Sequence, residues 1–165
     1  MPHSSDQTQP PGGAHSIETV TSADLDDLLA LMRVYCDFYR TDPSDRALLA
    51  LSRTLMADPA HEGLQLIARD EQSRAMGFAT IFWSWDTTEA SRIGIMNDLY
   101  VAPHARGSGC ADGLIHACAE HCVRRGASRL DWQTEPENGR AQALYDRVGA
   151  VRESWVSFTM ATPPA

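Results

Sequence analysis

Apolar residues in the first part of the chain recur with helical spacing. Side chains that fall three or four residues apart predict a helix with one buried face, formed by Leu25, Leu28, Leu29, Met32, Tyr35, Cys36 and Tyr39. Thr21 and Ser22 supply hydroxyls that can cap its start. Ser44 caps a second helix predicted over residues 44–57. A weaker alternation over 15–20 predicts a short strand ahead of both helices.

Period-two alternation replaces the helical pattern in the middle of the chain. Residues 64–68 and 75–85 predict two strands joined by a polar hairpin connection, and both faces of the second are apolar enough to place it centrally in a sheet. A strand over 93–101, a long helix over 109–125 and a strand over 128–133 follow. This order predicts a right-handed crossover whose two strands are parallel. A helix that starts at Asn138, and one or two strands over 150–160, complete a mixed α and β chain.

Length and composition fit one soluble domain. The chain has 165 residues, of which 43% are hydrophobic and 22% charged. No apolar run approaches the ~20 residues that cross a bilayer, so no membrane partner is expected. Residues 1–14 are polar and Pro-rich without periodicity, which predicts a disordered tail ahead of a single domain over 15–165. These first residues do not resemble a signal peptide, so we expect reduced thiols and a cytoplasmic location.

The net charge and the positions of the cysteines indicate which partners and which metal sites to expect. A formal net charge of −8 argues against nucleic-acid binding, which needs a basic surface, and favours cationic partners such as amines. On the helix predicted over 109–125, Cys118 and Cys122 fall on the apolar stripe while His121 points elsewhere. These positions favour core packing over metal binding, so we expect no metal site.

The glycine-bearing loop before the long helix carries the strongest chemical signal. A helix start presents unpaired N–H groups and the positive end of the helix dipole, which together bind phosphate or pyrophosphate. Gly107 and Gly109 let the backbone approach such a ligand closely, and Arg106 adds a positive charge suited to phosphate oxygens. The loop therefore predicts an anion site.

Two known nucleotide-binding motifs also combine glycines with the start of a helix and can be compared with this loop. A P-loop would need a lysine and a hydroxyl after its last glycine, and the sequence supplies neither. The dinucleotide fingerprint Gly-x-Gly-x-x-Gly is a nearer match. Gly107 and Gly109 fit its first two glycines, Gly113 comes one residue later than the third, and Asp131 stands about where a ribose-binding acid would. Only residues 112–165 follow the loop, too few for a doubly wound domain. A nicotinamide-dinucleotide-binding domain is therefore the less favoured alternative.

The loop and its surroundings resemble the GNAT superfamily of acyl-CoA-dependent N-acetyltransferases. The family motif is Gln or Arg, any two residues, Gly, any residue, then Gly or Ala, and it is met by Arg106, Gly107, Ser108, Gly109, Cys110 and Ala111. Asp98-Leu99-Tyr100-Val101 precedes the motif, and the spacing of Asn138, Ala141, Leu144 and Tyr145 resembles the second family signature. The likeness covers roughly residues 64–160. Residues 131–138 and the aromatic first helix are most similar to the Hpa-type branch, which acts on polyamines, amino acids or histones.

The resemblance implies a fold and a binding mode. The fold is α/β (mixed α+β): a central mixed, mostly antiparallel sheet of six to seven strands, with a parallel pair at the CoA site and about four flanking helices. The strand before the loop is expected to carry a bulge and to splay from the next parallel strand. Backbone N–H groups of residues 106–111 would hold the pyrophosphate of acetyl-CoA, and the backbone of Leu99, Tyr100 and Val101 would pair with its pantetheine arm.

The resemblance also implies an enzyme that moves acetyl from acetyl-CoA to a primary amine by direct attack. Tyr145 is expected to protonate the departing thiolate, with core packing as the alternative, and Asn138 to contact the cofactor arm. Asp98 is expected to deprotonate or orient the ammonium, with a structural strand carboxylate as the alternative. Tyr39 and Trp83 are expected to line the acceptor pocket, and for both residues plain packing is the alternative.

Three questions stay open at this level. The acceptor is a small-molecule amine (polyamine, amino acid or similar) or a protein amine, and no motif separates them. A catalytically silent acyl-CoA-binding module would use the same loop. Homodimers are common in the family, and no feature of this sequence decides that state.

Overall fold

Five strands form one sheet whose order in space follows their order in the chain. The computed structural model describes residues 15–162, and the tail predicted over 1–14 lies outside them. The strands are β1 (His15–Thr19), β2 (Gly63–Asp70), β3 (Ala75–Asp86), β4 (Ser91–Val101) and β5 (Ala127–Asp131). Neighbours are antiparallel except β4 and β5, which are parallel. The predicted mixed, mostly antiparallel sheet with one parallel pair is confirmed.

The chain falls into two compact units, one ending at Gln133 and one beginning at Thr134. The first holds the sheet and most of the helical elements: η1 (Ser22–Asp24), α1 (Leu25–Phe38), α2 (Asp45–Ala57), η2 (Pro103–Ala105) and α3 (Cys110–Arg124). The second holds α4 (Gly139–Arg147).

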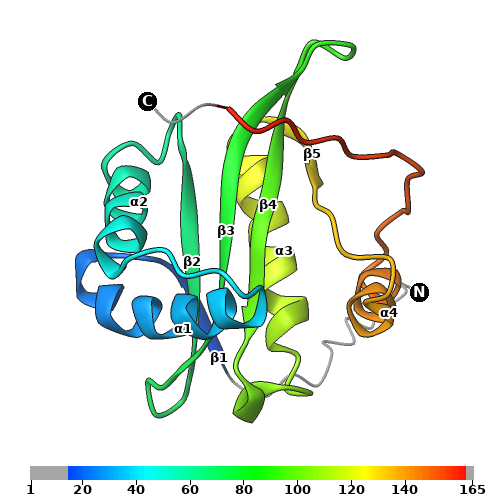
Figure 1. Ribbon diagram of the computed structural model, residues 1–165. Helices are drawn as coiled ribbons and strands as arrows, with labels where there is room; N and C mark the ends of the chain where they lie inside the picture. Colours follow the sequence, from blue (N-terminus) through cyan, green and yellow to red (C-terminus); the bar gives the residue numbers. More distant parts are fainter. Residues whose placement is uncertain (1–14, 163–165) are drawn as a thin grey trace, which may run out of the picture. The chain divides into compact units, whose positions relative to one another are not determined.

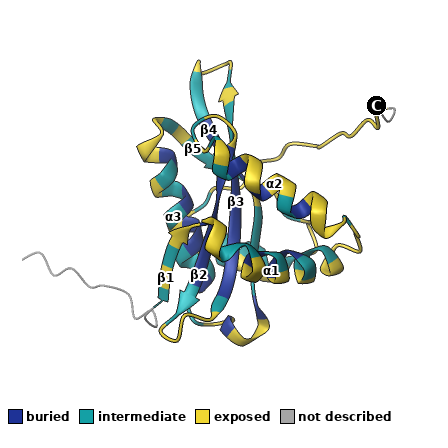
Figure 2. Cartoon of the chain, turned by 90° about the vertical axis from the view of Figure 1, so that its left-hand side faces the viewer, coloured by how far each residue is buried: buried dark blue, intermediate teal, exposed yellow. Residues whose placement is uncertain are grey.

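In the first unit, α1 and α2 cover one face of the sheet and α3 covers the other (Figures 1 and 2). Residues 76–81 of β3 are buried without a break, as expected for a strand enclosed on both faces. The prediction that this strand is central is confirmed. Phe78 and Ile67 belong to the core under α1, where Leu28 and Met32 also lie.

Local signals explain where the first helices begin. The Oγ of Ser44 accepts a hydrogen bond from the backbone N–H of Ala47 at 3.2 Å, so Ser44 is the N-cap of α2 as predicted. At the entry to α1, the Asp24 carboxylate accepts hydrogen bonds from the backbone N–H of Thr21 at 2.9 Å and from its hydroxyl at 2.7 Å.

The predicted strand count is wrong. Six to seven strands are expected from the resemblance, and residues 15–162 form five. The strands predicted over 150–160 are absent, because residues 151–162 have no regular secondary structure. Alternation specifies which side chains would share a face, but a strand also needs a partner for its backbone hydrogen bonds. Between Thr134 and residue 162 the second unit contains no such partner strand.

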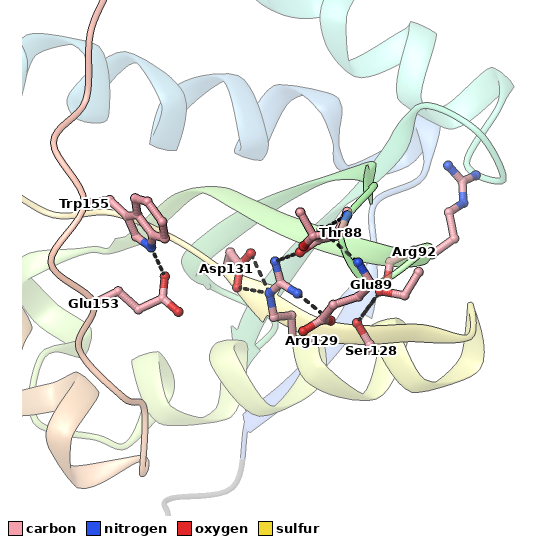
Figure 3. Close-up of polar contacts among 10 residues, drawn as sticks. Thr88, Glu89, Arg92, Ser128, Arg129, Asp131, Glu153 and Trp155 are labelled. Carbon is pink, nitrogen blue, oxygen red and sulfur yellow. Dashed lines mark hydrogen bonds and ion pairs between the residues drawn. The ribbon is translucent and has the colours of Figure 1, made fainter.

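Arg129 fixes β5 against the β3–β4 hairpin. Its guanidinium contacts the carboxylates of Asp86 at 2.7 Å, Glu89 at 3.0 Å and Asp131 at 3.0 Å, and Figure 3 shows it facing Glu89 and Asp131. Hydrogen bonds from Thr88 and from Arg129 hold the pKa of Asp86 below its usual range. The parallel pair is therefore held firmly at the end where β4 and β5 begin.

A glycine on β3 allows close approach to β4, and replacing it tests the sheet. A Cβ at Gly77 would lie 2.3 Å from the backbone oxygen of Tyr100 and 3.2 Å from the Cα of Val101. We expect Gly77→Ala to lower the free energy of unfolding by about 1–3 kcal/mol, because paired backbone cannot move aside as a side chain can. Urea denaturation measures this change. Gly139→Ala is the control, since a Cβ there meets nothing within 4 Å, and equal losses in both variants would contradict the prediction.

Candidate active site

The second half of β4 has a strand partner on only one side. β5 pairs with β4 from Arg92 to Ile95, where Ile95 stands opposite Asp131 and β5 ends. On its other edge, β4 stays paired with β3 as far as Val101. Within residues 15–162, no strand pairs with the β5-side edge of β4 over residues 96–101. β5 thus ends beside Ile95, and the backbone N–H and C=O groups of β4 beyond it have no strand partner on this edge among the described residues.

A bulge lies on β4 just beyond its last residue paired with β5. Thr80 pairs with Asp98 and Ile81 with Met96, so Asn97 is an extra residue on β4. A bulge of this kind redirects the side chains around it. Asn97 is exposed, while Asp98 lies opposite the buried Thr80. The bulge expected of this strand is present, and β5 ends beside Ile95 rather than continuing along β4.

The loop between β4 and α3 leaves the start of the helix without a side-chain cap. Gly109 is the N-cap residue with a φ of +82°, and Gly107 has a φ of +83°. Both positions need a residue that tolerates left-handed backbone. Side chains of Ser44 and Asn138 cap α2 and α4, whereas no side-chain hydrogen bond caps α3. The first turn of α3 is therefore open to an external anion.

The predicted anion-binding residues lie together at this junction. Leu99, Tyr100 and Val101 occupy the open end of β4, and residues 106–111 follow after η2. Arg106 is exposed, and the Ser108 hydroxyl donates to the backbone oxygen of Ala105 at 2.7 Å, which shapes the loop.

Asp98 is surrounded by uncharged polar side chains under α1. Asn97 Nδ2 donates a hydrogen bond to Oδ1 of Asp98 at 3.0 Å, and the hydroxyls of Thr80 and Tyr35 lie near enough to favour its carboxylate form. The buried Gln65 in turn donates from Nε2 to Oγ1 of Thr80 at 3.2 Å. Burial raises the pKa of Asp98, and the hydrogen bonds only partly offset it. A carboxyl group in these surroundings is suited to accept and release a proton nearer to neutral pH.

Tyr35 is a member of this group that the sequence prediction missed. Burial and the neighbouring carboxylate of Asp98 raise the pKa of Tyr35 far above its usual value. Its ring makes an edge contact with Phe78 at 5.7 Å between centroids. The sequence signal that could have identified Tyr35 is its position one helical turn before Tyr39, on the face of the first helix predicted to be buried.

The structure brings Tyr39 to this group but not Trp83. Tyr39 is the C-cap of α1, and the centroid of its ring lies 5.0 Å from that of Tyr35 in an edge contact. Trp83 lies on the α3 face of the sheet, where its Nε1 donates to the backbone oxygen of Pro59 at 2.9 Å and the Arg125 guanidinium stands over its ring. Asp98 and Trp83 therefore face opposite helical layers.

Asn138 and Tyr145 belong to the second unit. The Asn138 side chain accepts from the backbone N–H of Ala141 at 3.1 Å and is the N-cap of α4, and Tyr145 lies further along that helix. The helix starts at the residue that the sequence predicts. The roles expected for these two residues stay predictions.

The residues behind the rival interpretations have packing roles. A Cβ at Gly113 would meet Nε2 of His15 at 2.8 Å, so this glycine lets α3 approach β1, and Asp131 is bound by Arg129.

Cys118 and Cys122 are buried as predicted, and burial raises their pKa values to about 12 and about 11. In the described part of the chain, no three His, Cys, Asp or Glu side chains are grouped to hold a metal ion. No helix in residues 15–162 is both long and apolar enough to cross a membrane.

Comparison with known proteins agrees with this geometry. Residues 26–150 match the Acetyltransferase (GNAT) family. The uncharacterized N-acetyltransferase YhfO of Bacillus subtilis is 31% identical over 134 residues, 81% of this chain and 88% of that protein. The D-amino-acid N-acetyltransferase HPA3 of Saccharomyces cerevisiae is 31% identical over 120 residues, 72% of this chain and 73% of that protein. The solved structure of the aminoglycoside N-acetyltransferase AAC(6')-Iy in complex with CoA shares the fold, with a TM-score of 0.78 at 23% identity over 93% of this chain and 98% of that chain.

Proposed function

Because the chain belongs to the GNAT family of N-acetyltransferases, we propose that it transfers the acetyl group of acetyl-CoA to a primary amine of a small molecule. The observation that carries this proposal is the open edge of β4 over residues 96–101, which leads directly into the uncapped start of α3. An extended acyl-thioester arm can pair with the first, and a pyrophosphate can bind at the second.

The binding roles follow from this geometry. Backbone N–H groups of residues 106–111 hold the pyrophosphate, and the Arg106 guanidinium adds charge-assisted hydrogen bonds to it. The backbone of Leu99, Tyr100 and Val101 pairs with the pantetheine arm as β5 would have paired had it continued. Asn138 is proposed to contact the same arm.

The chemical roles fall to two side chains. Acetyl-CoA supplies a thioester carbon that a neutral amine can attack directly. Asp98 takes the proton that the amine must lose, and its raised pKa suits this exchange. Tyr145 donates a proton to the departing thiolate sulfur.

The acceptor is proposed as a cationic small molecule such as an amino acid or a polyamine. The net charge of −8 favours cationic ligands by electrostatic steering, and the yeast relative HPA3 is named for acetylation of D-amino acids. Tyr39, half exposed beside the Asp98 group, is the residue proposed to contact the acceptor.

A panel of amines tests the reaction. We expect CoA release from acetyl-CoA to rise at least about tenfold over the amine-free rate with one or more amino acids or polyamines. The chain contains no lysine, so its own side chains add no amine background. Acetyl-CoA binding without release on any amine would instead indicate a silent acyl-CoA-binding module. Release only with a lysine-containing peptide would move the acceptor to protein amines, and tighter binding of NADH than of acetyl-CoA would favour a dinucleotide site.

Replacing Asp98 tests the proton acceptor. Asp98→Asn keeps the shape of the side chain but cannot take up a proton, so we expect kcat to fall about 100-fold. Because burial raises the pKa of Asp98, the wild-type kcat/KM rises with pH above the ordinary aspartate range of about 4, and this limb should vanish in the variant. Initial rates between about pH 5 and pH 9 measure it. Asp58→Asn, at an exposed carboxylate paired with His61, is the matched control. An unchanged acidic limb in Asp98→Asn would remove Asp98 as the base.

Replacing the Tyr145 hydroxyl tests the proton donor. Tyr145→Phe keeps the ring, so we expect an unchanged melting temperature and an unchanged KM for acetyl-CoA, with kcat about 100-fold lower. Steady-state kinetics and thermal unfolding give the three quantities. Wild-type turnover across the pH range in a normally folded variant would exclude Tyr145 as the acid.

A further inference from the structure

Four aromatic rings form a continuous row from the core of the first unit to the surface at the end of α1. The Tyr35 ring makes an edge contact with the buried Phe78, with 5.7 Å between the ring centroids. Tyr39 contacts Tyr35 at 5.0 Å, and Phe38 contacts Tyr39 at 5.1 Å, again edge to face. Tyr39 is 47% exposed and Phe38 is 68% exposed. The row therefore ends in two aromatic side chains that solvent can reach.

The same row of rings lies beside the open edge of β4. The centroid of Tyr35 is 6.2 Å from that of Tyr100, which stands opposite Phe78 in the sheet. Asp98 comes two residues before Tyr100 and stands opposite Thr80, so both side chains lie on the α1 face of β4. Figure 1 shows α1 crossing the sheet toward β4. The exposed rings are therefore on the side of the sheet where the proposed acceptor amine meets Asp98.

Two physical effects favour a positive charge at the end of α1. A helix C-terminus is the negative end of the helix dipole and is stabilised by cations near it. The last turns of α3 and α4 carry basic side chains, whereas the last turn of α1 carries none. The face of an aromatic ring also attracts a cation. This chain uses that attraction elsewhere, where the Arg92 guanidinium stands 4.8 Å from the centroid of the Trp85 ring.

The charged side chains around the end of α1 leave this place to a ligand. Arg33 is paired with Asp45 and, at 3.4 Å, with Asp42. Asp37 in the last turn of α1 and Arg40 directly after Tyr39 are exposed and opposite in sign. Three carboxylates thus accompany two guanidinium groups, and the sum of these charges does not oppose the binding of a cation.

We propose that the exposed rings of Tyr39 and Phe38 bind a second cationic group of the acceptor, so that the preferred acceptor is a linear diamine or polyamine. This proposal rests on the proposed function, since the other amine of the same molecule is the one that attacks acetyl-CoA beside Asp98. A monoamine lacks the second cation. An amino acid would place its carboxylate near the negative end of α1, which repels it.

Linear diamines, compared with alkylamines of the same carbon count and with amino acids, test the site. In the wild type we expect kcat/KM for the best diamine to exceed that for its alkylamine about tenfold, and to exceed that for any amino acid. Replacing both rings, Tyr39→Leu with Phe38→Leu, keeps apolar side chains, so the ratio of diamine to alkylamine should fall close to one while the alkylamine kcat/KM stays at its wild-type value. A general loss of structure would lower both values and leave the ratio unchanged.

Three single replacements complete the design. Tyr39→Phe keeps both rings and should keep the diamine preference. Trp85→Leu is the matched control, because it removes an exposed ring from β3 instead, and its ratio should equal that of wild type. Arg40→Gln gives the sign of the bound charge, since removal of a neighbouring cation should raise kcat/KM for diamines and would lower it for a ligand held by its carboxylate.

The outcomes separate this proposal from the proposed function. Equal kcat/KM for diamines and alkylamines, or a diamine preference that survives the loss of both rings, overturns the cation site while acetyl transfer stands. A preference for amino acids that Arg40→Gln weakens overturns it in favour of a carboxylate site. If the wild type acetylates no amine, the proposed function fails, and calorimetric titration with the diamines then tests the rings alone. About tenfold weaker binding without the two rings supports the site, and equal binding or none to the wild type overturns it.

Discussion

The structure depends on one constraint, which is that backbone N–H and C=O groups need partners, and on its β5 side β4 has a partner strand only as far as Ile95. Arg129 holds β5 against the β3–β4 hairpin through the carboxylates of Asp86 and Glu89, so the pair cannot separate where it begins. β5 ends opposite Ile95, and the bulge at Asn97 turns the next side chains of β4. The open edge of β4 is followed in the chain by η2, the glycine loop and the uncapped start of α3. A ligand that satisfies backbone groups along an extended segment and ends in an anion fits both.

Sequence reasoning succeeded where the signal is local. Ser44 and Asn138 cap the helices predicted to follow them, because a cap depends on residues three positions apart. The parallel pairing of β4 with β5 follows from chain order, and the central place of β3 follows from its apolar faces. The turn at Gly107 and Gly109 could be predicted because left-handed backbone conformations strongly favour glycine.

Prediction failed where the cause lies in distant contacts. The meeting of Tyr35 with Asp98 joins α1 to β4, and no pattern within either segment specifies it. Trp83 is as aromatic as Tyr39, yet its position on β3 turns it to the α3 face, where Arg125 covers it. Residues 150–160 alternate like a strand, but alternation carries no information about a pairing partner. The two carboxylates Asp86 and Asp98 show the same limit, since hydrogen bonds from Thr88 and Arg129 lower the pKa of one and burial raises that of the other.

The glycine N-cap of α3 also links folding to ligand supply. A helix start with a glycine N-cap forgoes about a few tenths of a kcal/mol that a serine or asparagine would contribute. An anion that binds there completes the helix and favours the folded chain, by about 2.7 kcal/mol when its concentration is 100 times its dissociation constant. Binding of the proposed co-substrate at the start of α3 would therefore couple the stability of the folded chain to the concentration of that ligand.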